Sequence, residues 1–323
     1  MAFPNLTDIV VTTIENRSKE VADNVTNNNA VLKWISKAGN VRTFDGGRTI
    51  YENFSFQENG NTGFYSGYDA LPVGAQDVIT GAEFQIKQAS TQVSISGLEQ
   101  IQNSGREALI DLLDQRLEVA ENSLANLLNK GIYSDGTGFN GKQITGLQAG
   151  ITTSPTTGVY GGIDRSVWSM WRNQKFQGTV DGTGAVTSTN MLGYMNTLYA
   201  KLVRGTDKPN LILMDQNFWS LYVAALQPQQ RFTNPDEADA GFVSLLFMNT
   251  PVVLDTSLSG IPSNTAYFLN TKFLKWRPYT GRNFKTLDPG ARYSINQDAQ
   301  TQIMAWAGNL TCNGVKFQGV LTN

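Results

Sequence analysis

The sequence has no histidine, and Cys312 is its only cysteine. Without histidine, the chain lacks the commonest general base, the commonest metal ligand and the usual pH-responsive side chain of proteins. A single cysteine excludes an intrachain disulfide and a cysteine-rich metal site. We therefore expect no cofactor and no metal site, and the chain is predicted not to be an enzyme.

Charge is also scarce. Only 16% of the 323 residues are charged, and the net charge at pH 7 is -2. Proteins that bind nucleic acid usually carry a basic surface, so this balance argues against a surface built to neutralise phosphates. It is compatible with a protein that lies beside nucleic acid without adhering to it.

Targeting and membrane signals are missing as well. The first ten residues have no basic region followed by an apolar stretch, and the apolar run at 243–248 is too short to span a bilayer. We expect a chain that is made and kept in a cytoplasm-like compartment, with no membrane partner.

A real core is nevertheless predicted. Apolar residues make up 40% of the chain and aromatic residues 10%, which suffices for one large domain or two ordinary ones. Gly, Ser, Thr, Asn and Gln fill the remainder. This composition is typical of architecture rich in strands and loops.

The most informative segment is 41–96. Period-two alternation predicts strands over 41–56 and 78–96, joined by a turn-rich tip at 59–69. An isolated two-stranded ribbon is marginal in water, so the segment requires a partner outside itself. Phe64, Tyr65 and Tyr68 lie in this polar tip and are predicted to be inter-subunit anchors.

A long helix follows at 104–130. Ser104 and Glu107 form a capping box, leucines recur at spacings of three and four, and Gly131 is expected to end the helix. Its length is about 39 Å at 1.5 Å per residue. The opposite face, with Asp111, Asp114, Glu118 and Glu121, is interpreted as solvated or inter-subunit.

Shorter elements are expected on both sides of this helix. Two short helices are predicted within 5–38, the second ending at Gly39. Further helices are expected near 189–204 and 217–226. Strands are expected at 211–214, 243–248, 252–254, 266–269, 273–276, 302–306 and 315–320.

Two motifs that could carry chemistry are unconvincing. Residues 136–143 fit G-x-G-x-x-G, but a phosphate-binding loop needs a strand before it and a helix after it, and here a long helix precedes it. Nucleotide binding is therefore not expected. Asp164 and Arg165 are interpreted as an ion pair that locks a loop.

Several segments carry a family resemblance: 24–29, 46–48, 66–68, 103–105, 143–147, 161–165, 171–173 and 306–310. Taken in order, they resemble the major capsid protein of tailed bacteriophages with the HK97-type fold. The resemblance implies an α+β fold with an N-terminal arm at 1–40 and an extended β-hairpin, the E-loop, at 41–96. It implies a peripheral domain at 97–150 with the long spine helix, and a mainly axial domain with interleaved peripheral segments at 151–290. Strands at 291–323 would return to the peripheral domain.

The resemblance also implies a function. Such proteins form hexamers and pentamers of an icosahedral shell around double-stranded DNA, and their E-loop lies across a neighbouring subunit. The expected partners are other copies of the chain, packaged DNA, and portal, scaffolding or decoration proteins. The expected location is the virion, after assembly in the host cytoplasm. Alternatives are an encapsulin-like nanocompartment with protein cargo, another virion structural protein, and, disfavoured, a β-rich hydrolase or sugar-binding enzyme.

Some relatives join the E-loop to a neighbour through a Lys–Asn isopeptide bond. Lys87 is the only lysine between Val41 and Ser96, and it lies far from the tip. We therefore predict no such cross-link, and cohesion through buried surface alone.

Overall fold

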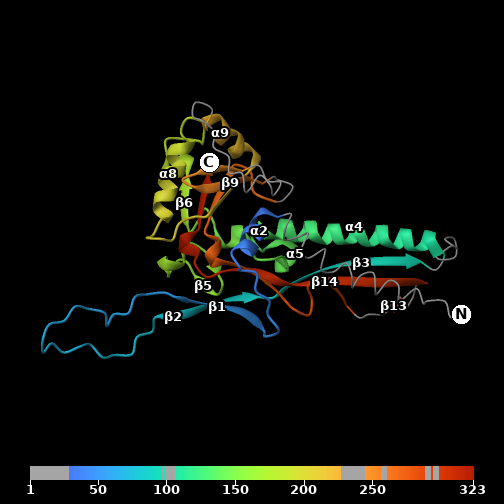
Figure 1. Cartoon of the computed structure of the whole chain (residues 1–323), viewed down its shortest axis with the longest axis horizontal. Coiled ribbons are helices and arrows are strands. Elements are labelled where there is room, and N and C mark those ends of the chain that lie inside the picture. Colours follow the sequence, from blue (N-terminus) through green and yellow to red (C-terminus); the bar gives the residue numbers. More distant parts are fainter. Residues whose placement is uncertain are drawn as a thin grey trace.

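The computed structural model describes residues 29–96, 98, 106–226, 244–255, 260–287, 292–293 and 298–323. The first helix expected within 5–38, and Ser104 of the capping box, lie outside these residues. Figure 1 shows a long helix beside long strands, a second unit that carries further helices, and an extended segment that projects away from both.

The first unit is a helix packed on a sheet. Helix α4 (Arg106–Ile132) lies along strand β3 (Lys87–Ser96), which pairs with β14 (Ala299–Cys312) over its whole length. The other side of β14 pairs with three short strands. These are β11 (Leu274–Pro278), β12 (Lys285–Thr286) and β13 (Arg292–Tyr293).

Helix α4 confirms the predicted long helix, but it continues beyond Gly131 to Ile132. Gly131 does not act as a cap. A β-carbon at this position would lie 3.2 Å from the Ile144 side chain, so the missing side chain allows the close approach of the following loop.

The segment expected to form a single hairpin divides at Ile86. Strand β2 (Ile79–Gln85) pairs with β1 (Thr49–Ser55), and these two strands are called the ribbon below. Strand β3 leaves the ribbon and pairs with β14 instead. The prediction of one continuous return strand is therefore wrong. The reason is tertiary: β14 satisfies the backbone of ten residues while Ala89 and Val93 pack against the core.

The second unit is a six-stranded mixed sheet in the order β6-β15-β10-β7-β9-β8. Strand β15 pairs in parallel with β6, and β7 pairs in parallel with β9. The strands are β6 (Gln174–Gln177), β7 (Leu211–Met214), β8 (Ser244–Phe247), β9 (Thr250–Leu254), β10 (Thr265–Leu269) and β15 (Gly319–Thr322). The C-terminal strands therefore do not all return to the first unit, because β15 belongs to this sheet.

Both faces of the six-stranded sheet are covered. Helices α8 (Met191–Leu202) and α9 (Gln216–Leu226) pack on one face, against Ile212 and Met214. Leu211 and Leu213 point to the opposite face and join the core of the first unit. The alternation of side chains along β7 explains why a continuous apolar run is buried on both sides.

The N-terminal part of the described chain confirms the predicted second short helix. Helix α2 (Ala30–Lys37) begins after Asn29, whose side chain accepts hydrogen bonds from the backbone N–H groups of Val31 (3.0 Å) and Leu32 (3.2 Å). Gly39, with a φ of 70°, ends it in the left-handed conformation.

Short elements complete the chain. The expected strand at 315–320 is only partly right, because a 3₁₀ turn occupies its first half and β15 begins at Gly319. The remaining elements are α5 (Gly138–Gly141), α6 (Leu147–Gly150), β4 (Val159–Tyr160), β5 (Ile163–Asp164), η1 (Ser169–Trp171), α7 (Gly178–Asp181), η3 (Thr271–Phe273) and η4 (Val315–Phe317).

Candidate inter-subunit arm

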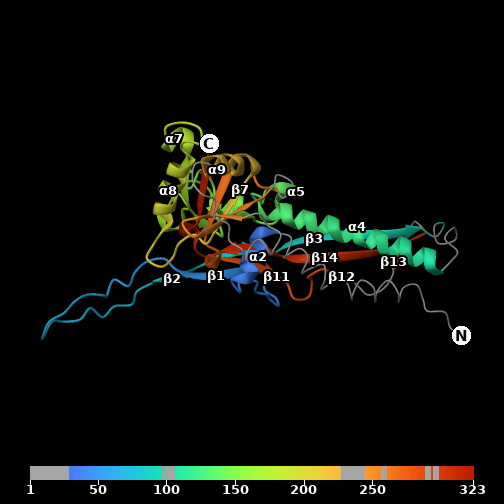
Figure 2. The ribbon, with the colours of Figure 1, turned by 45° about the horizontal axis from the view of Figure 1, so that its top comes forward.

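The ribbon continues into an extended arm, residues 56–78. The arm and helix α4 project in opposite directions from the body of the molecule (Figures 1 and 2). The three predicted anchors all lie on this arm and are highly exposed: Phe64 at 110%, Tyr65 at 67% and Tyr68 at 109%. Three large aromatic side chains in water have no stabilising role within one chain. Their contact with a neighbour remains a prediction.

Sequence reasoning missed two further apolar residues on the arm. Leu71 and Val73 are 56% and 95% exposed. Their signal was the apolar triplet 71–73 inside an otherwise polar turn-rich stretch, in which Pro72 prevents ladder pairing.

Amide side chains hold the two limbs of the arm together. The N–H of Phe56 donates to the carbonyl of Val78 (3.1 Å). Beyond this point Gln57 Nε2 donates to the carbonyl of Asp77 and Asn61 Nδ2 to that of Gly74, both at 2.7 Å. Because side chains replace the backbone ladder, much of the arm's backbone stays available to other partners.

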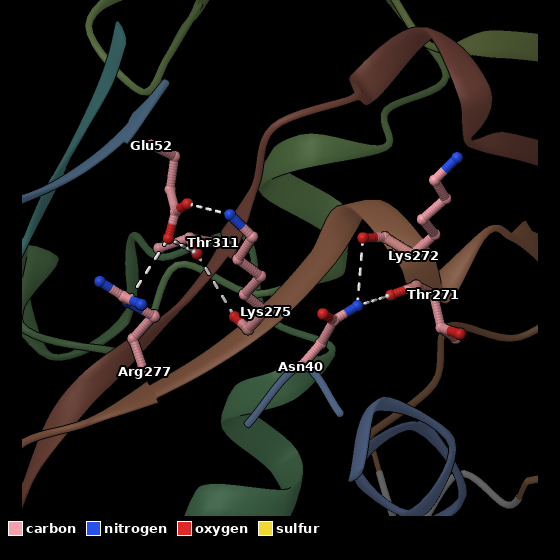
Figure 3. Close-up of polar contacts among 7 residues, drawn as sticks. All are labelled: Asn40, Glu52, Thr271, Lys272, Lys275, Arg277 and Thr311. Atoms are coloured by element: carbon pink, nitrogen blue, oxygen red, sulfur yellow. Dashed lines mark hydrogen bonds and ion pairs between the residues drawn. The ribbon is translucent and has the colours of Figure 1, made fainter. Parts of the chain in front are cut away.

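The root of the ribbon is fixed to the first unit by a buried carboxylate. Glu52 of β1 forms ion pairs with Lys275 and Arg277 of β11, the latter at 3.4 Å (Figure 3). Thr311 of β14 donates to Glu52 Oε1 (3.1 Å). One acidic side chain therefore joins three strands, and its burial is possible because two cations and a hydroxyl surround it.

A neighbouring contact fixes the chain before the ribbon. Asn40 Nδ2 donates to the carbonyls of Thr271 (2.7 Å) and Lys272 (3.1 Å), which connects the end of α2 to the 3₁₀ turn before β11 (Figure 3).

Aromatic side chains form a second attachment. Phe54 of β1 stacks on Trp171, and Phe84 of β2 packs edge-on against Tyr160 with ring centroids 5.2 Å apart. Trp171 Nε1 donates to the carbonyl of Tyr160 (2.8 Å). The ribbon is thus held on the body by rings from both of its strands.

The glycine pair 161–162 allows this close packing. Gly161 has a φ of 58°, and a β-carbon there would lie 3.0 Å from both Ala82 Cβ and Phe84 Cζ. Its carbonyl accepts a hydrogen bond from the N–H of Glu83 (2.9 Å). The position therefore requires glycine for its conformation and for the room it leaves.

Two segments on which the resemblance was based meet at Asn309, which is fully buried. Its Oδ1 accepts from the N–H of Thr145 (3.0 Å), and its Nδ2 donates to the carbonyl of Gln85 (2.8 Å). Asn309 therefore links β14, the loop after α4 and the end of the ribbon.

The predicted Asp164–Arg165 ion pair is wrong. Arg165 is buried and donates to the carbonyls of Ala149 (2.8 Å) and Gly150 (2.7 Å). Asp164 instead accepts from the N–H and the hydroxyl of Ser166, both at 2.8 Å. Asp164 ends β5, whereas Arg165 begins the turn after it, and the two side chains bind different partners.

The acidic face of α4 is more complex than predicted. Glu118 is exposed, but Glu121 is buried. The interpretation of a uniformly solvated face is therefore wrong at Glu121. The side chains of Asp111 and Asp114 lie outside the described part.

Residues 136–143 form a tight turn with no resemblance to a phosphate loop. It follows α4, and Phe139 and Asn140 adopt left-handed backbone conformations. Among the described residues, no cluster of three or more potential metal ligands occurs, and no helix combines the length and apolarity that a bilayer crossing requires.

Three titratable groups lie in the core beneath the ribbon root. Burial raises the pKa of the Cys312 thiol to about 12, and burial with the nearby thiol raises that of Tyr160 well above its usual value. Burial lowers the pKa of Arg165. These shifts follow from desolvation and indicate a dry structural core.

Comparison of the whole fold with solved structures identifies its class. The cyanophage A-1(L) capsid subunit is similar over 89% of this chain and 92% of its own, with a TM-score of 0.62 and 20% identity. A subunit of the native GTA particle capsid matches 89% of both chains, with a TM-score of 0.55 and 11% identity.

An encapsulin gives a comparable match. The SrpI encapsulin of Synechococcus elongatus PCC 7942 is similar over 90% of this chain and 86% of its own, with a TM-score of 0.56 and 8% identity. Neither a protein-family model nor a curated protein matches the sequence. The fold is therefore the α+β HK97-like fold of capsid subunits, as the sequence resemblance predicted.

Proposed function

We propose that this chain is the major capsid protein of a tailed bacteriophage and self-assembles into hexamers and pentamers of an icosahedral shell around double-stranded DNA. The proposal rests on one observation about the arm. The arm continues from the ribbon, which is anchored to the body at Glu52 and at Trp171, yet the aromatic residues of the arm are left in water. Such a structure is useful only when a neighbour covers it.

The proposed assembly uses packing rather than chemistry. A standard interface buries about 800 Å² per partner. Each arm would place Phe64, Tyr65 and Tyr68 on an adjacent copy, and the closed lattice would make many modest contacts cooperative. The near-neutral net charge of -2 suits a container that a motor fills, rather than one that condenses DNA by attraction.

We also propose a domain assignment for the two units. In this proposal, α4 with β3 and β14 forms the peripheral domain, and the six-stranded sheet with α8 and α9 forms the axial domain at the five- and six-fold positions. Portal, scaffolding or decoration proteins would be further partners, with assembly in the host cytoplasm and the virion as destination.

Deletion of residues 59–69 tests the role of the arm. These residues are almost entirely exposed, so we expect the shortened chain to keep its circular dichroism spectrum and unfolding midpoint. Negative-stain microscopy and size exclusion should then show closed shells for the unmodified chain and none for the deletion. Normal shells from the deleted chain would contradict the proposal.

The second candidate is an encapsulin-like compartment, because the SrpI encapsulin shares the fold with a similar TM-score. The contents of particles purified from the natural host distinguish the two. Nuclease-protected double-stranded DNA is expected for a capsid, and a protein cargo for a compartment.

A further inference from the structure

The ribbon and arm carry charge of one sign only. Between residues 53 and 86 there is no lysine or arginine, and the four acidic residues are all exposed. They are Glu58, Asp69, Asp77 and Glu83. In a chain with 25 cationic and 27 acidic residues, this is a strongly uneven distribution.

Two of these acids lie at the same level of the arm. The hydrogen bond from Gln57 Nε2 to the carbonyl of Asp77 places Glu58 on one limb near Asp77 on the other. No lysine or arginine between residues 53 and 86 offsets these two negative charges. The arrangement would be stabilised by positive charge supplied from outside.

The opposite charge gathers on the body, around the turn after α8. The backbones of Arg204 and Asp207 exchange two hydrogen bonds (2.8 and 3.0 Å), and Lys272 Nζ lies 2.9 Å from Asp207 Oδ1. Lys316 belongs to η4, next to Phe317, whose ring stacks on that of Phe273, the residue after Lys272, with ring centroids 4.4 Å apart. Burial, and secondly the charge of Arg204, lowers the pKa of Lys316. Lys208 continues the same turn and is exposed.

We call Arg204, Lys208, Lys272 and Lys316 the basic patch. Four cations and the carboxylate of Asp207 leave it with a net charge of +3. The side chain of Lys272 extends away from Asn40, to which its backbone is bonded (Figure 3). Its exposure leaves it open to a partner.

We propose that the basic patch of one copy receives the acidic arm of a second copy, with Glu58 and Asp77 facing Arg204 and Lys208. The inference rests on the proposed function as a shell subunit and names the surface that the arm meets. Complementary charge would guide the arm to its place and fix its register, while the aromatic residues supply most of the buried area.

A reciprocal charge exchange tests this pairing. One variant carries Glu58→Lys and Asp77→Lys, and a second carries Arg204→Glu and Lys208→Glu. These side chains make no described hydrogen bond or ion pair, so both variants should fold normally. Each should raise the protein concentration needed for assembly by about tenfold, since like charges then meet at the interface. The chain with all four changes should recover most of this loss.

The control carries Lys142→Glu and Lys285→Glu, two exposed lysines outside the basic patch, and should assemble like the unmodified chain. Normal assembly of the arm variant, or no recovery in the fourfold variant, would overturn the inference. Normal assembly with loss of encapsidated nucleic acid in the patch variant would assign the patch to nucleic acid instead.

A second measurement does not depend on shell formation. A fluorescent peptide spanning residues 56–78 should bind the protein from which residues 59–69 have been deleted. Binding should weaken at least about tenfold when the same deleted protein also carries Arg204→Glu and Lys208→Glu, or at 0.5 M salt. Equal binding of the peptide to the deleted protein with and without the two charge changes would contradict this inference alone. Absence of shells from the unmodified chain would contradict the proposed function instead.

Discussion

Phe54 lies nearly flat on Trp171, with ring centroids 4.4 Å apart and an interplanar angle of 20°. The contact joins strand β1 of the ribbon to η1 on the body, close to the point where the arm begins. Because the Trp171 ring is itself fully buried, this stack fixes the direction in which the arm leaves the molecule.

Replacement of this tryptophan should be costly. We expect Trp171→Ala to lower the free energy of unfolding by about 3–5 kcal/mol, through lost burial and the cavity left behind. Urea unfolding followed by circular dichroism measures the change. Trp168→Ala is the control: Trp168 is 47% exposed and contacts Phe56 at a centroid distance of 6.0 Å, so its loss should cost less than about 1 kcal/mol. Equal losses in both variants would show that the stack has no special role.

The ion pairs at the root give a second prediction. Glu52→Gln preserves shape but leaves the half-buried cations of Lys275 and Arg277 without their counter-charge. We expect a loss of about 3–5 kcal/mol in unfolding free energy. Glu83→Gln, an exposed change on the paired strand, should leave stability nearly unchanged. A change below about 1 kcal/mol for Glu52→Gln would mean that the ribbon root does not depend on this charge.

Gly161 and Gly158 form a matched pair. Both have positive φ, 58° and 84°, but a β-carbon at Gly158 would meet no atom within 4 Å. Gly158→Ala should therefore cost about 1 kcal/mol through backbone strain alone. Gly161→Ala adds the collision with Ala82 and Phe84 and should cost a further 1–3 kcal/mol or so. Thermal unfolding of the two variants separates strain from packing.

Alkaline pH should destabilise the chain. Burial raises the pKa of Cys312 from 9.0 to about 12, so above pH 9 the unfolded state loses a proton that the folded state keeps. Since the folded state then binds more protons, the free energy of unfolding falls with rising pH between 9 and 12, by up to about 1.4 kcal/mol per pH unit. Cys312→Ala should be less stable at pH 8 but show a shallower decline between pH 9 and 10.

The remaining slope above pH 10 is expected from Tyr133, Tyr160, Tyr222 and Tyr267, whose pKa values burial also raises. An identical slope for Cys312→Ala and the unmodified chain between pH 9 and 10 would contradict the assignment to the thiol.

The absence of a covalent cross-link between subunits is a fifth prediction. Lys87 lies at the start of β3, where its Nζ donates to the carbonyl of Gly141 and to Gln85 Oε1. It is thus held at the body, away from the arm, and the rest of 41–96 has no lysine. Purified shells boiled in detergent should run as one band on a denaturing gel. A ladder of covalent multimers, removed by a Lys87→Arg change, would prove the prediction wrong.

Local patterns predicted the elements that depend on their own residues. The leucine spacing in 104–130 predicted α4, and the apolar run at 211–214 predicted β7 with the observed bounds. Asn29 and Gly39 mark the ends of α2, because caps act within one turn of a helix. The exposure of Phe64, Tyr65 and Tyr68 also followed from their polar surroundings.

Local patterns did not predict pairings between distant parts of the chain. The alternation in 78–96 predicts strand on both sides of Ile86, but only the presence of β14 decides that β3 leaves the ribbon. In the same way, the residues near Glu52 in the sequence do not predict its burial, because Lys275 and Arg277, which pair with it, come from β11.

By itself, the sequence determined that this protein has a long helix, a projecting aromatic segment and no histidine-based chemistry. The first two follow from patterns that extend over neighbouring residues, and the third follows from composition alone. Only the tertiary structure decided where the projecting segment is fastened and what it leaves exposed. Glu52, Trp171 and Gly161 meet the ribbon there from separate elements, and burial and charge compensation depend on distances in space rather than along the chain.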